Sequence, residues 1–490
     1  MDNLQSLQYF WPEMLLAGVA ILLLLVDIFR RKPTVQYLQW IAVAGVVLTF
    51  IAVALQSGQP AVTLFFQQVV ADPFALFFKS LILLATLFLL FVIAKSEQLK
   101  TYHLGEFFSL IFFMVLGMFL LVSAYDLVMV YLSLEVVSIT SFILAGYMKQ
   151  NKASNEAALK YVIYGAFSSG LMLFGFSLLY GLTGATNFHA IGSAVPLLGG
   201  TAQVALLISV ILVLAGFGYK ISAVPFHFWT PDVYEGAPTP ITAYLSVAPK
   251  AAGFAILIRF FSDIFTAMPL VEGWYGWQML LAVLAAVTMT LGNLVALQQT
   301  NVKRMLAYST IAHAGYMLMG IPIVSQEGQY GIMIYLIMYL FMNLGAFFVV
   351  IAVQNRSGSA DLGAFRELGW KMPFLGVVMT IFLFSLTGLP PTAGFIGKFY
   401  IFAAVIKAGP DFYWLALVGI LNSVVSLYYY FRVVKIMFLR GERQETLLNP
   451  SRTMMALLIC LAVPVLFLGI YWAPIADWVR NSMVLFTNTL

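Results

Sequence analysis

Residues 216–250 read GFGYKISAVPFHFWTPDVYEGAPTPITAYLSVAPK and combine five prolines and two lysines within a strongly apolar chain. A proline lacks the backbone N–H and clashes with the preceding helical turn, so each is expected to interrupt or end a helix. These prolines are Pro225, Pro231, Pro238, Pro240 and Pro249. The two lysines, Lys220 and Lys250, are charged residues in surroundings where hydrocarbon makes a charge costly. The stretch therefore predicts broken helices that carry buried charges.

The composition assigns the whole chain to a membrane. Of its 490 residues, 62% are hydrophobic and only 9% are charged, and the mean hydropathy is +0.96. Soluble domains carry about 25% charged residues. The single cysteine, Cys460, rules out a disulfide framework and a cysteine-ligated iron–sulfur site. The sequence also has no P-loop, dinucleotide fingerprint, zinc motif or catalytic triad, so any redox chemistry is expected on another chain.

Runs of about twenty apolar residues predict an all-α polytopic membrane protein with about fourteen transmembrane helices. The expected spans are 11–29, 37–55, 74–95, 104–122, 125–147, 156–182, 202–227, 238–260, 277–298, 302–322, 329–353, 373–407, 412–437 and 453–473. The seventh and twelfth are long and contain prolines, so both are expected to be discontinuous. Most of the 25 Lys and Arg residues fall in loops on one side, which predicts that both termini face the periplasm or its equivalent.

Five ionisable residues lie too deep in the expected spans to reach either surface. They are Glu135, Lys220, Lys250, His313 and Lys398. A charge at the centre of a span costs about 2.5–3.5 kcal/mol on insertion scales. These side chains are therefore expected to face a hydrated interior or one another, and to carry function.

Three further lysines lie closer to the ends of spans. Lys160 is about two turns from the inner end of the sixth span, which leaves both a functional role and snorkelling to the interface open. Lys79 and Lys407 lie near outer ends, and both are expected to snorkel.

A constant displacement suggests an internal repeat. Glu135 and His313 are 178 positions apart, and so are Lys220 and Lys398. A shift of five spans reverses the direction of the chain, which predicts two inverted five-helix repeats. Chance agreement of two pairs remains the alternative, because Lys250 has Tyr428 at the displaced position. The predicted units are a three-helix segment at 1–103, repeats at 104–262 and 277–440, and a last span within 441–490.

Both repeats place a lysine close to a proline break. The first break lies in KISAVPFHFW, residues 220–229, and the second in GLPPTAGFIGKF, residues 388–399. A break frees backbone carbonyls and admits water, which is tolerated at membrane depth only where it lines a polar cavity. A lysine there can take up and release one proton. Glu135 paired with Lys220 would hold that proton, and their separation would release it towards Lys250, His313 and Lys398.

Five segments resemble the antiporter-like subunits of respiratory complex I. They are SLEVVSITSFILAGY (133–147), EAALKYVIYGAFSSGLMLFG (156–175), KISAVPFHFWTPDVYEGAPTPITAYLSVAPKAA (220–252), NVKRMLAYSTIAHAGYMLMG (301–320) and GLPPTAGFIGKFYIF (388–402). The resemblance implies a proton-translocating membrane-arm subunit of a bacterial inner membrane, beside other antiporter-like subunits. It implies NADH, FMN, iron–sulfur clusters and quinone on neighbouring chains, with no cofactor on this one. It also implies a hydrophilic axis through Glu135, Lys220, Lys250 and Lys398.

Related families leave alternatives open. One complex I paralogue typically has glutamate where this chain has Lys398, and another carries a long lateral helix after its last span, so the chain resembles a third. Subunits of multisubunit cation/proton antiporters and membrane-bound hydrogenases share the core motifs, and they differ in energy source. A structural spacer is disfavoured by the buried charges.

Overall fold

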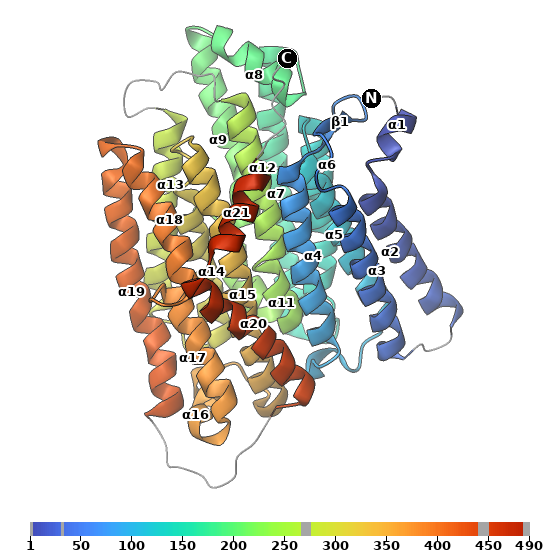
Figure 1. Ribbon diagram of the computed structural model, residues 1–490, viewed down its shortest axis with the longest axis vertical. Helices are drawn as coiled ribbons and strands as arrows, with labels where there is room; N and C mark the ends of the chain where they lie inside the picture. Colours follow the sequence, from blue (N-terminus) through green and yellow to red (C-terminus); the bar gives the residue numbers. More distant parts are fainter. Residues whose placement is uncertain (1–2, 31–33, 266–275, 440–449, 484–490) are drawn as a thin grey trace.

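The computed structural model describes residues 3–30, 34–265, 276–439 and 450–483. Most of them are helical, and the long helices run side by side (Figure 1). The first half contains α1 (Asn3–Leu7), α2 (Trp11–Phe29), α3 (Val35–Leu55), α4 (Pro73–Ile93), α5 (Gly105–Ser123), α6 (Leu127–Ala145), α7 (Lys152–Thr183), α8 (Phe188–Ala194), α9 (Thr201–Ile221), α10 (Trp229–Gly236), α11 (Thr239–Leu245) and α12 (Ala248–Ile264).

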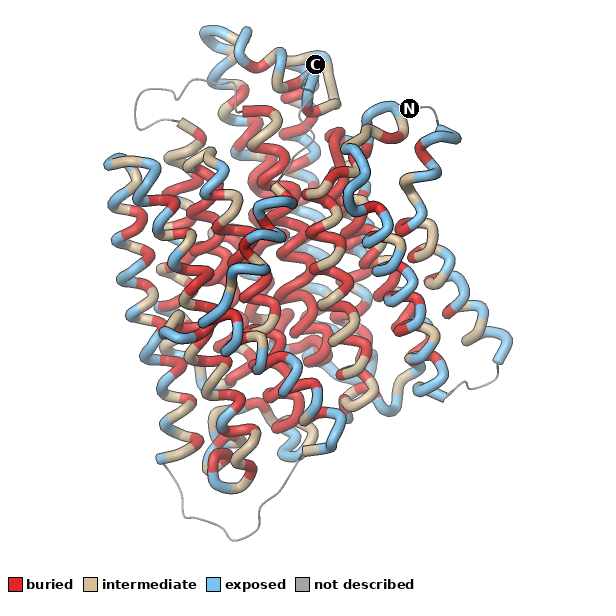
Figure 2. Tube along the Cα trace, in the orientation of Figure 1, coloured by how far each residue is buried: buried red, intermediate tan, exposed pale blue. Residues whose placement is uncertain are grey.

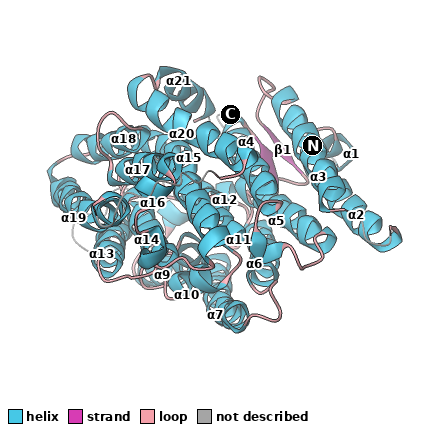
Figure 3. Ribbon diagram, turned by 90° about the horizontal axis from the view of Figure 1, so that it is seen from below, coloured by secondary structure: helices cyan, strands magenta, loops and turns pink. Residues whose placement is uncertain are grey.

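The second half contains α13 (Trp277–Ala296), α14 (Val302–Leu318), α15 (Gln326–Ser357), α16 (Leu368–Lys371), α17 (Pro373–Thr387), α18 (Ala393–Lys407), α19 (Tyr413–Phe438), α20 (Arg452–Ile470) and α21 (Ala473–Ser482). Short 3₁₀ helices cover Glu97–Leu99, Val195–Leu197, Leu362–Phe365 and Pro410–Phe412. A small antiparallel hairpin pairs β1 (Val62–Leu64) with β2 (Val69–Ala71), in a register that places Val62 opposite Ala71. Seen end-on, α2 and α3 form one edge of the bundle and α19 forms the opposite edge (Figure 3).

Twelve helices of the described chain are long and apolar enough to cross a membrane, or thirteen if the bent pair Leu362–Lys371 and Pro373–Thr387 forms one span. The sequence predicted about fourteen by run length. The tenth expected span is α14, which has 17 residues, and the twelfth is divided into α17 and α18 with 15 residues each. A helix that is packed inside protein or broken at mid-membrane needs no long unbroken apolar run. The protein is an all-α polytopic membrane protein.

The prolines of the opening stretch mostly begin helices. Pro231, Pro240 and Pro249 lie in the first turn of α10, α11 and α12, so the expectation that each interrupts or ends a helix is wrong for these three. A first-turn N–H has no acceptor within its helix, so proline is tolerated there. Pro238 is the residue that precedes α11. Pro225 follows the end of α9 and lies in a true break.

Both expected helix interruptions are confirmed. The helix α9 ends at Ile221, and Ser222 follows in the left-handed region with φ of 66°. The helix α17 ends at Thr387, and Gly388 follows with φ of 89°. A left-handed residue ends a helix because it turns the chain away from the helical path. A further interruption between α11 and α12 was not expected.

Corresponding elements recur along the chain, but at a different displacement from the one expected. The helices α7 and α15 both have 32 residues, and Gly358 closes α15 as Gly184, 174 positions earlier, closes α7. The two left-handed break residues, Ser222 and Gly388, are 166 positions apart. Neither value is 178, and Lys220 precedes its break whereas Lys398 follows its own, so the two lysines do not occupy equivalent positions relative to the breaks. Superposition of the copies by a two-fold axis in the membrane plane remains a prediction.

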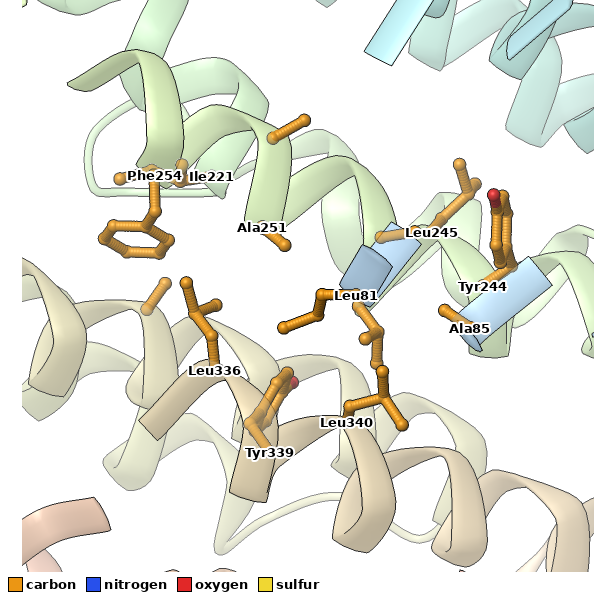
Figure 4. Packing of buried hydrophobic residues seen from close by; sticks show 14 of the residues in the cluster. Leu81, Ala85, Ile221, Tyr244, Leu245, Ala251, Phe254, Leu336, Tyr339 and Leu340 are labelled. Atoms are coloured by element: carbon orange, nitrogen blue, oxygen red, sulfur yellow. The ribbon is translucent and has the colours of Figure 1, made fainter. Parts of the chain in front are cut away.

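The centre of the bundle is formed by helices from both halves. Buried residues concentrate along the middle of the bundle (Figure 2). The most apolar stretch of α11 and α12 is fully buried, and that of α15 is 89% buried. In the close-up of Figure 4, Leu81 of α4 lies among Leu245 of α11, Ala251 of α12 and Tyr339 of α15. The deep polar residues described next are set into this packed interior.

Candidate functional site

Lys220 lies in the last turn of α9, directly before the first break. Its side chain is buried, and Nζ donates a hydrogen bond to Ser138 Oγ of α6 at 3.3 Å. A Cβ placed on Gly253 of α12 would lie 3.5 Å from Lys220 Cγ and 2.8 Å from Ile221 Cγ2. The glycine therefore lets α12 pack directly against the end of α9, which holds the lysine stem in place.

Glu135 lies on α6, one turn before Ser138. Its carboxylate makes no ion pair with Lys220 among the described residues, so the direct pair that the sequence suggested is not formed. The two groups interact electrostatically without contact. Glu135 is half-buried and sits beside Leu132 and Val136, which are exposed, and its Oε1 is buried without a hydrogen-bond partner in the described chain. The carboxylate is thus held at the border between the protein interior and an uncovered helix face.

Lys250 on α12 is completely buried. Its Nζ donates to two oxygens of one residue on α14, the carbonyl of Thr310 at 3.1 Å and Thr310 Oγ1 at 3.0 Å. The ring of Tyr234 lies 6.0 Å from the same nitrogen. No carboxylate forms an ion pair with Lys250 in the part of the chain that the structure describes. Neutral oxygens and a ring therefore hold this side chain.

His313 lies on α14 one turn after Thr310 and connects three helices. Its Nδ1 is 2.6 Å from the hydroxyl of Tyr335 on α15, and its Nε2 is 3.2 Å from the hydroxyl of Tyr430 on α19. The Tyr430 hydroxyl is also 2.5 Å from Ser309 Oγ. Both ring nitrogens thus have a hydroxyl partner that can donate or accept a proton.

Lys398 lies on α18, after the second break. Its Nζ donates to the carbonyl of Thr387, the last residue of α17, at 2.8 Å and to Ser423 Oγ at 3.2 Å. The same nitrogen is 4.5 Å from the ring centroid of Tyr316 on α14. A cation over an aromatic face and at a helix C-terminus is favourably placed in both respects.

One face of α14 joins the two lysines. Thr310 contacts Lys250, Tyr316 contacts Lys398, and His313 lies between them, each one turn from the next. Residues spaced by three lie on the same side of a helix. The structure therefore brings Lys250, His313 and Lys398 into one buried polar series.

The hydroxyl partners of this series were not among the residues predicted from the sequence. Thr310, Tyr316, Tyr335, Ser423 and Tyr430 are all buried or partly buried, yet none of them is charged. Hydroxyl residues are common in apolar helices, and their number alone does not distinguish a partner of lysine from packing. The spacing of Thr310, His313 and Tyr316 was the available signal.

Lys160 lies outside the buried series. Its side chain is 37% exposed and forms ion pairs with Glu156 at 2.7 Å and with Asp232 at 2.6 Å. Asp232 on α10 also pairs with Arg304 at 2.7 Å. Burial alone would raise the pKa of the Asp232 carboxyl, but hydrogen bonds and charge from Lys160 and Arg304 hold that pKa below its usual value. Lys160 thus belongs to an ion-pair network around α10.

Two cations are buried in ion pairs. Lys79 on α4 pairs with Glu13 on α2 at 2.6 Å, so the expectation that it snorkels is wrong. Arg259 on α12 binds Asp72 through two hydrogen bonds of 2.8 and 3.0 Å. Each pair neutralises a charge inside the protein, which removes the need to reach water.

Two other lysines contrast with each other. Lys303, in the first turn of α14, is buried and donates to the carbonyls of Glu235 and Ala237 at 3.1 and 2.6 Å. These carbonyls lie at the end of α10, where a cation satisfies groups that the helix leaves free. Lys407 is exposed at the end of α18 and pairs with Glu327, in agreement with snorkelling.

The described residues contain no group of three or more His, Cys, Asp or Glu side chains that could hold a metal ion. The one cysteine, Cys460, is exposed on α20.

The chain matches known proteins over most of its length. Residues 124–426 match the family model described as NADH:quinone oxidoreductase/Mrp antiporter, TM. A protein named NADH-quinone oxidoreductase subunit N 2 from Chloroherpeton thalassium is 47% identical, over 97% of this chain and 94% of its own. A subunit N from Anaeromyxobacter is 45% identical, over 99% of this chain and 98% of its own.

Solved structures show the same fold. A chain of respiratory complex I from Thermus thermophilus matches with a TM-score of 0.78 and 30% identity, covering 95% of this chain and 98% of that one. A chain of the Mrp complex from Dietzia matches with a TM-score of 0.78 at 21% identity, over 98% of this chain and 97% of that one. At the lower identity the likeness concerns the fold alone.

Proposed function

Because the chain belongs to the NADH:quinone oxidoreductase/Mrp antiporter family of membrane subunits, we propose that it is subunit N of a bacterial NADH-quinone oxidoreductase (complex I). In this role it carries protons through the membrane arm, while other subunits hold NADH, FMN, iron–sulfur clusters and quinone. Its neighbours are other membrane-arm subunits, including antiporter-like paralogues. The location is the bacterial inner membrane, with both termini on the periplasmic side.

One observation carries the proton path: α14 presents Thr310, His313 and Tyr316 between Lys250 and Lys398. Each lysine donates to an oxygen and has no ion-pair partner in the described chain. An ammonium that contacts only neutral oxygens and rings can pass its proton on more readily than one held in an ion pair, because no carboxylate has to be separated from it. His313 and its two tyrosine hydroxyls offer acceptor and donor sites between the lysines.

Glu135 and Lys220 form the other end of the path. Because Lys220 contacts Ser138, one turn from Glu135, movement of either side chain would change the electrostatic support for the lysine charge. Approach of the carboxylate would hold the proton on Lys220, and withdrawal would release it towards Lys250. The unpartnered Glu135 Oε1 at an uncovered face also supports control by a side chain of a neighbouring subunit.

The test replaces Lys220 with alanine and Lys398 with arginine in the intact assembly. Arginine keeps the charge but cannot be deprotonated in a protein. We expect both variants to assemble and both to lose at least about tenfold in NADH-driven proton pumping, with quinone-linked NADH oxidation falling in parallel. The measurement is NADH oxidation with quinone, together with quenching of a pH-sensitive dye, in inverted membrane vesicles.

Lys149→Gln is the matched control, since Lys149 is an exposed lysine in the loop after α6. If both variants assembled and pumped at the rate of this control, the proposed path would be wrong. The alternative function is that of a subunit of a cation/proton antiporter or of a hydrogenase. It is distinguished from the proposed one by the energy source that drives proton movement. Pumping that required an imposed sodium gradient rather than NADH and quinone would favour it.

A further inference from the structure

A cavity of about 700 Å³ lies along α17 and α19 and opens towards the surroundings of the bundle. Its lining includes Phe384, Leu389, Leu427, Phe431, Arg432 and Lys435. Figure 1 shows α19 at the edge of the bundle and α17 next to it. Sites of this size hold small organic molecules. None of these residues belongs to the proton path.

The cavity has an apolar body and a cationic end. Val424, Tyr428 and Phe431 are 64%, 66% and 48% exposed, so one side of α19 offers apolar surface outwards. Arg432 and Lys435 lie in the last two turns of the same helix, close to its end at Phe438. From Val424 to Lys435 the helix rises about 16 Å, which is comparable with half the hydrocarbon thickness of a bilayer.

The cations at this end are not neutralised within the described chain. Arg432 donates to the carbonyls of Leu297, at 2.9 Å, and Gln299, while its Nε is buried without a partner. Lys435 is exposed and forms no ion pair with a described carboxylate. By contrast, Lys407 at the opposite end of the bundle pairs with Glu327. Two uncompensated positive charges therefore border an apolar cavity.

We propose that this cavity binds an anionic phospholipid of the inner leaflet. Lys435 contacts the phosphate, the positive charge of Arg432 one turn earlier attracts it, and one acyl chain runs along α19 towards Leu389. Basic residues near the membrane surface attract anionic headgroups. In a lipid the phosphate lies directly above the acyl chains, just as the basic end of this cavity lies next to its apolar body. A protein helix would need to bring an acidic residue to the same level. Charge complementarity therefore favours the lipid as occupant.

The tail end of the cavity lies at the second helix break. Leu389 directly follows Gly388, and a Cβ on Gly388 would lie 2.8 Å from Lys398 Cδ. An acyl chain against Leu389 would thus cover the side of the break that faces lipid. The lipid would be retained during purification because both its ends have partners.

The experiment uses the intact assembly in nanodiscs of phosphatidylcholine with a minor fraction of phosphatidylglycerol. Lipid retained after transfer to detergent is quantified by mass spectrometry, and the cavity is inspected by cryo-electron microscopy. Lys435→Gln should lower retained phosphatidylglycerol about fivefold, the effect of one basic residue near a membrane surface. Val424→Trp should block the groove and remove acyl-chain density, while Lys149→Gln should retain lipid as the wild type does.

Three results would overturn the proposal. The first is equal retention of phosphatidylcholine and phosphatidylglycerol by the wild type. The second is unchanged phosphatidylglycerol retention in both the Lys435 and Val424 variants. The third is a helix of a neighbouring subunit filling the cavity in the intact assembly.

Discussion

The two helix breaks place a lysine on opposite sides of the interruption. Lys220 is in the last turn before the first break, and Lys398 is in the second turn of the helix that follows the second break. Lys398 folds back and donates to Thr387 O, so its charge satisfies a free carbonyl at the end of α17. Lys220 points away from its own helix end to Ser138 of α6.

The difference follows from how each helix end is satisfied. At the first break, Tyr219 O accepts from the Trp229 indole at 3.1 Å, and Gly218 O accepts from the N–H of Ala223 at 2.7 Å. The N–H of Val224 donates to Thr288 Oγ1 of α13 at 3.0 Å. With these groups satisfied locally, Lys220 is not needed as a cap. Lys398 therefore caps the helix end at its break, whereas Lys220 does not cap the helix end at its own break.

The largest expected difference between the two breaks is the loss of stability when a side chain is added to a glycine beside each of them. A Cβ at Gly394 in the second break would lie 1.8 Å from the carbonyl oxygen of Ser385, whereas a Cβ at Gly253 beside the first break would meet only side chains, at 2.8 Å and beyond. We expect Gly394→Ala to cost about 3 kcal/mol of stability and Gly253→Ala about 1 kcal/mol, because side chains yield more easily than backbone.

Thermal denaturation of the purified assembly measures both effects. Gly170→Ala in α7 is the control, since no atom lies within 4 Å of its added Cβ. Equal losses for Gly394→Ala and Gly170→Ala would show that the second break is not tightly packed.

A smaller effect tests the capping role itself. Methionine in place of lysine keeps the volume of the side chain and removes its charge and donors. Lys398→Met should lower the stability by about 1–3 kcal/mol, because Thr387 O loses its partner in a buried setting. Lys220→Met should be neutral or stabilising, since it removes a buried charge that no carboxylate contacts. The measurement is the denaturation midpoint of each variant. A lower midpoint for Lys220→Met than for Lys398→Met would contradict the capping role of Lys398.

The smallest effect concerns α10, which follows the first break. Lys160 and Arg304 hold the pKa of Asp232 below its usual value, despite a burial contribution that raises it. A carboxyl with a lowered folded-state pKa contributes stability above its unfolded value of about 3.9, and this contribution is lost as the pH falls through the folded value.

Asp232→Asn should therefore lower the thermal midpoint at neutral pH and flatten its decline below about pH 4. Asp411→Asn is the control, because Asp411 has no ion-pair partner in the described chain. If the thermal midpoint of Asp232→Asn fell below pH 4 as steeply as that of the wild type, the ion-pair network would add nothing to the stability of α10.

The charged residues of the proposed proton path could be picked out from the sequence because charge is rare in this chain. Lys220, Lys250 and Lys398 stand out in apolar runs, and both breaks could be placed from Pro225 and from the pair of prolines after Leu389. The hydroxyl partners could not be placed in the same way. Ser138 and Tyr430 are ordinary residues in a membrane helix until a packed neighbour brings a lysine or a histidine to them.

The sequence by itself determined that the chain is a membrane protein, where two of its helices are interrupted and that Lys220, Lys250 and Lys398 are buried charges. These features depend on local chemistry: apolar run length, the missing N–H of proline and the cost of a charge in hydrocarbon. Only the tertiary structure decided that Lys79 is neutralised by Glu13, that Glu135 makes no direct pair with Lys220, and that α14 lies between the central lysines. Such contacts depend on the rotation and spacing of helices far apart in the chain, which are set by packing.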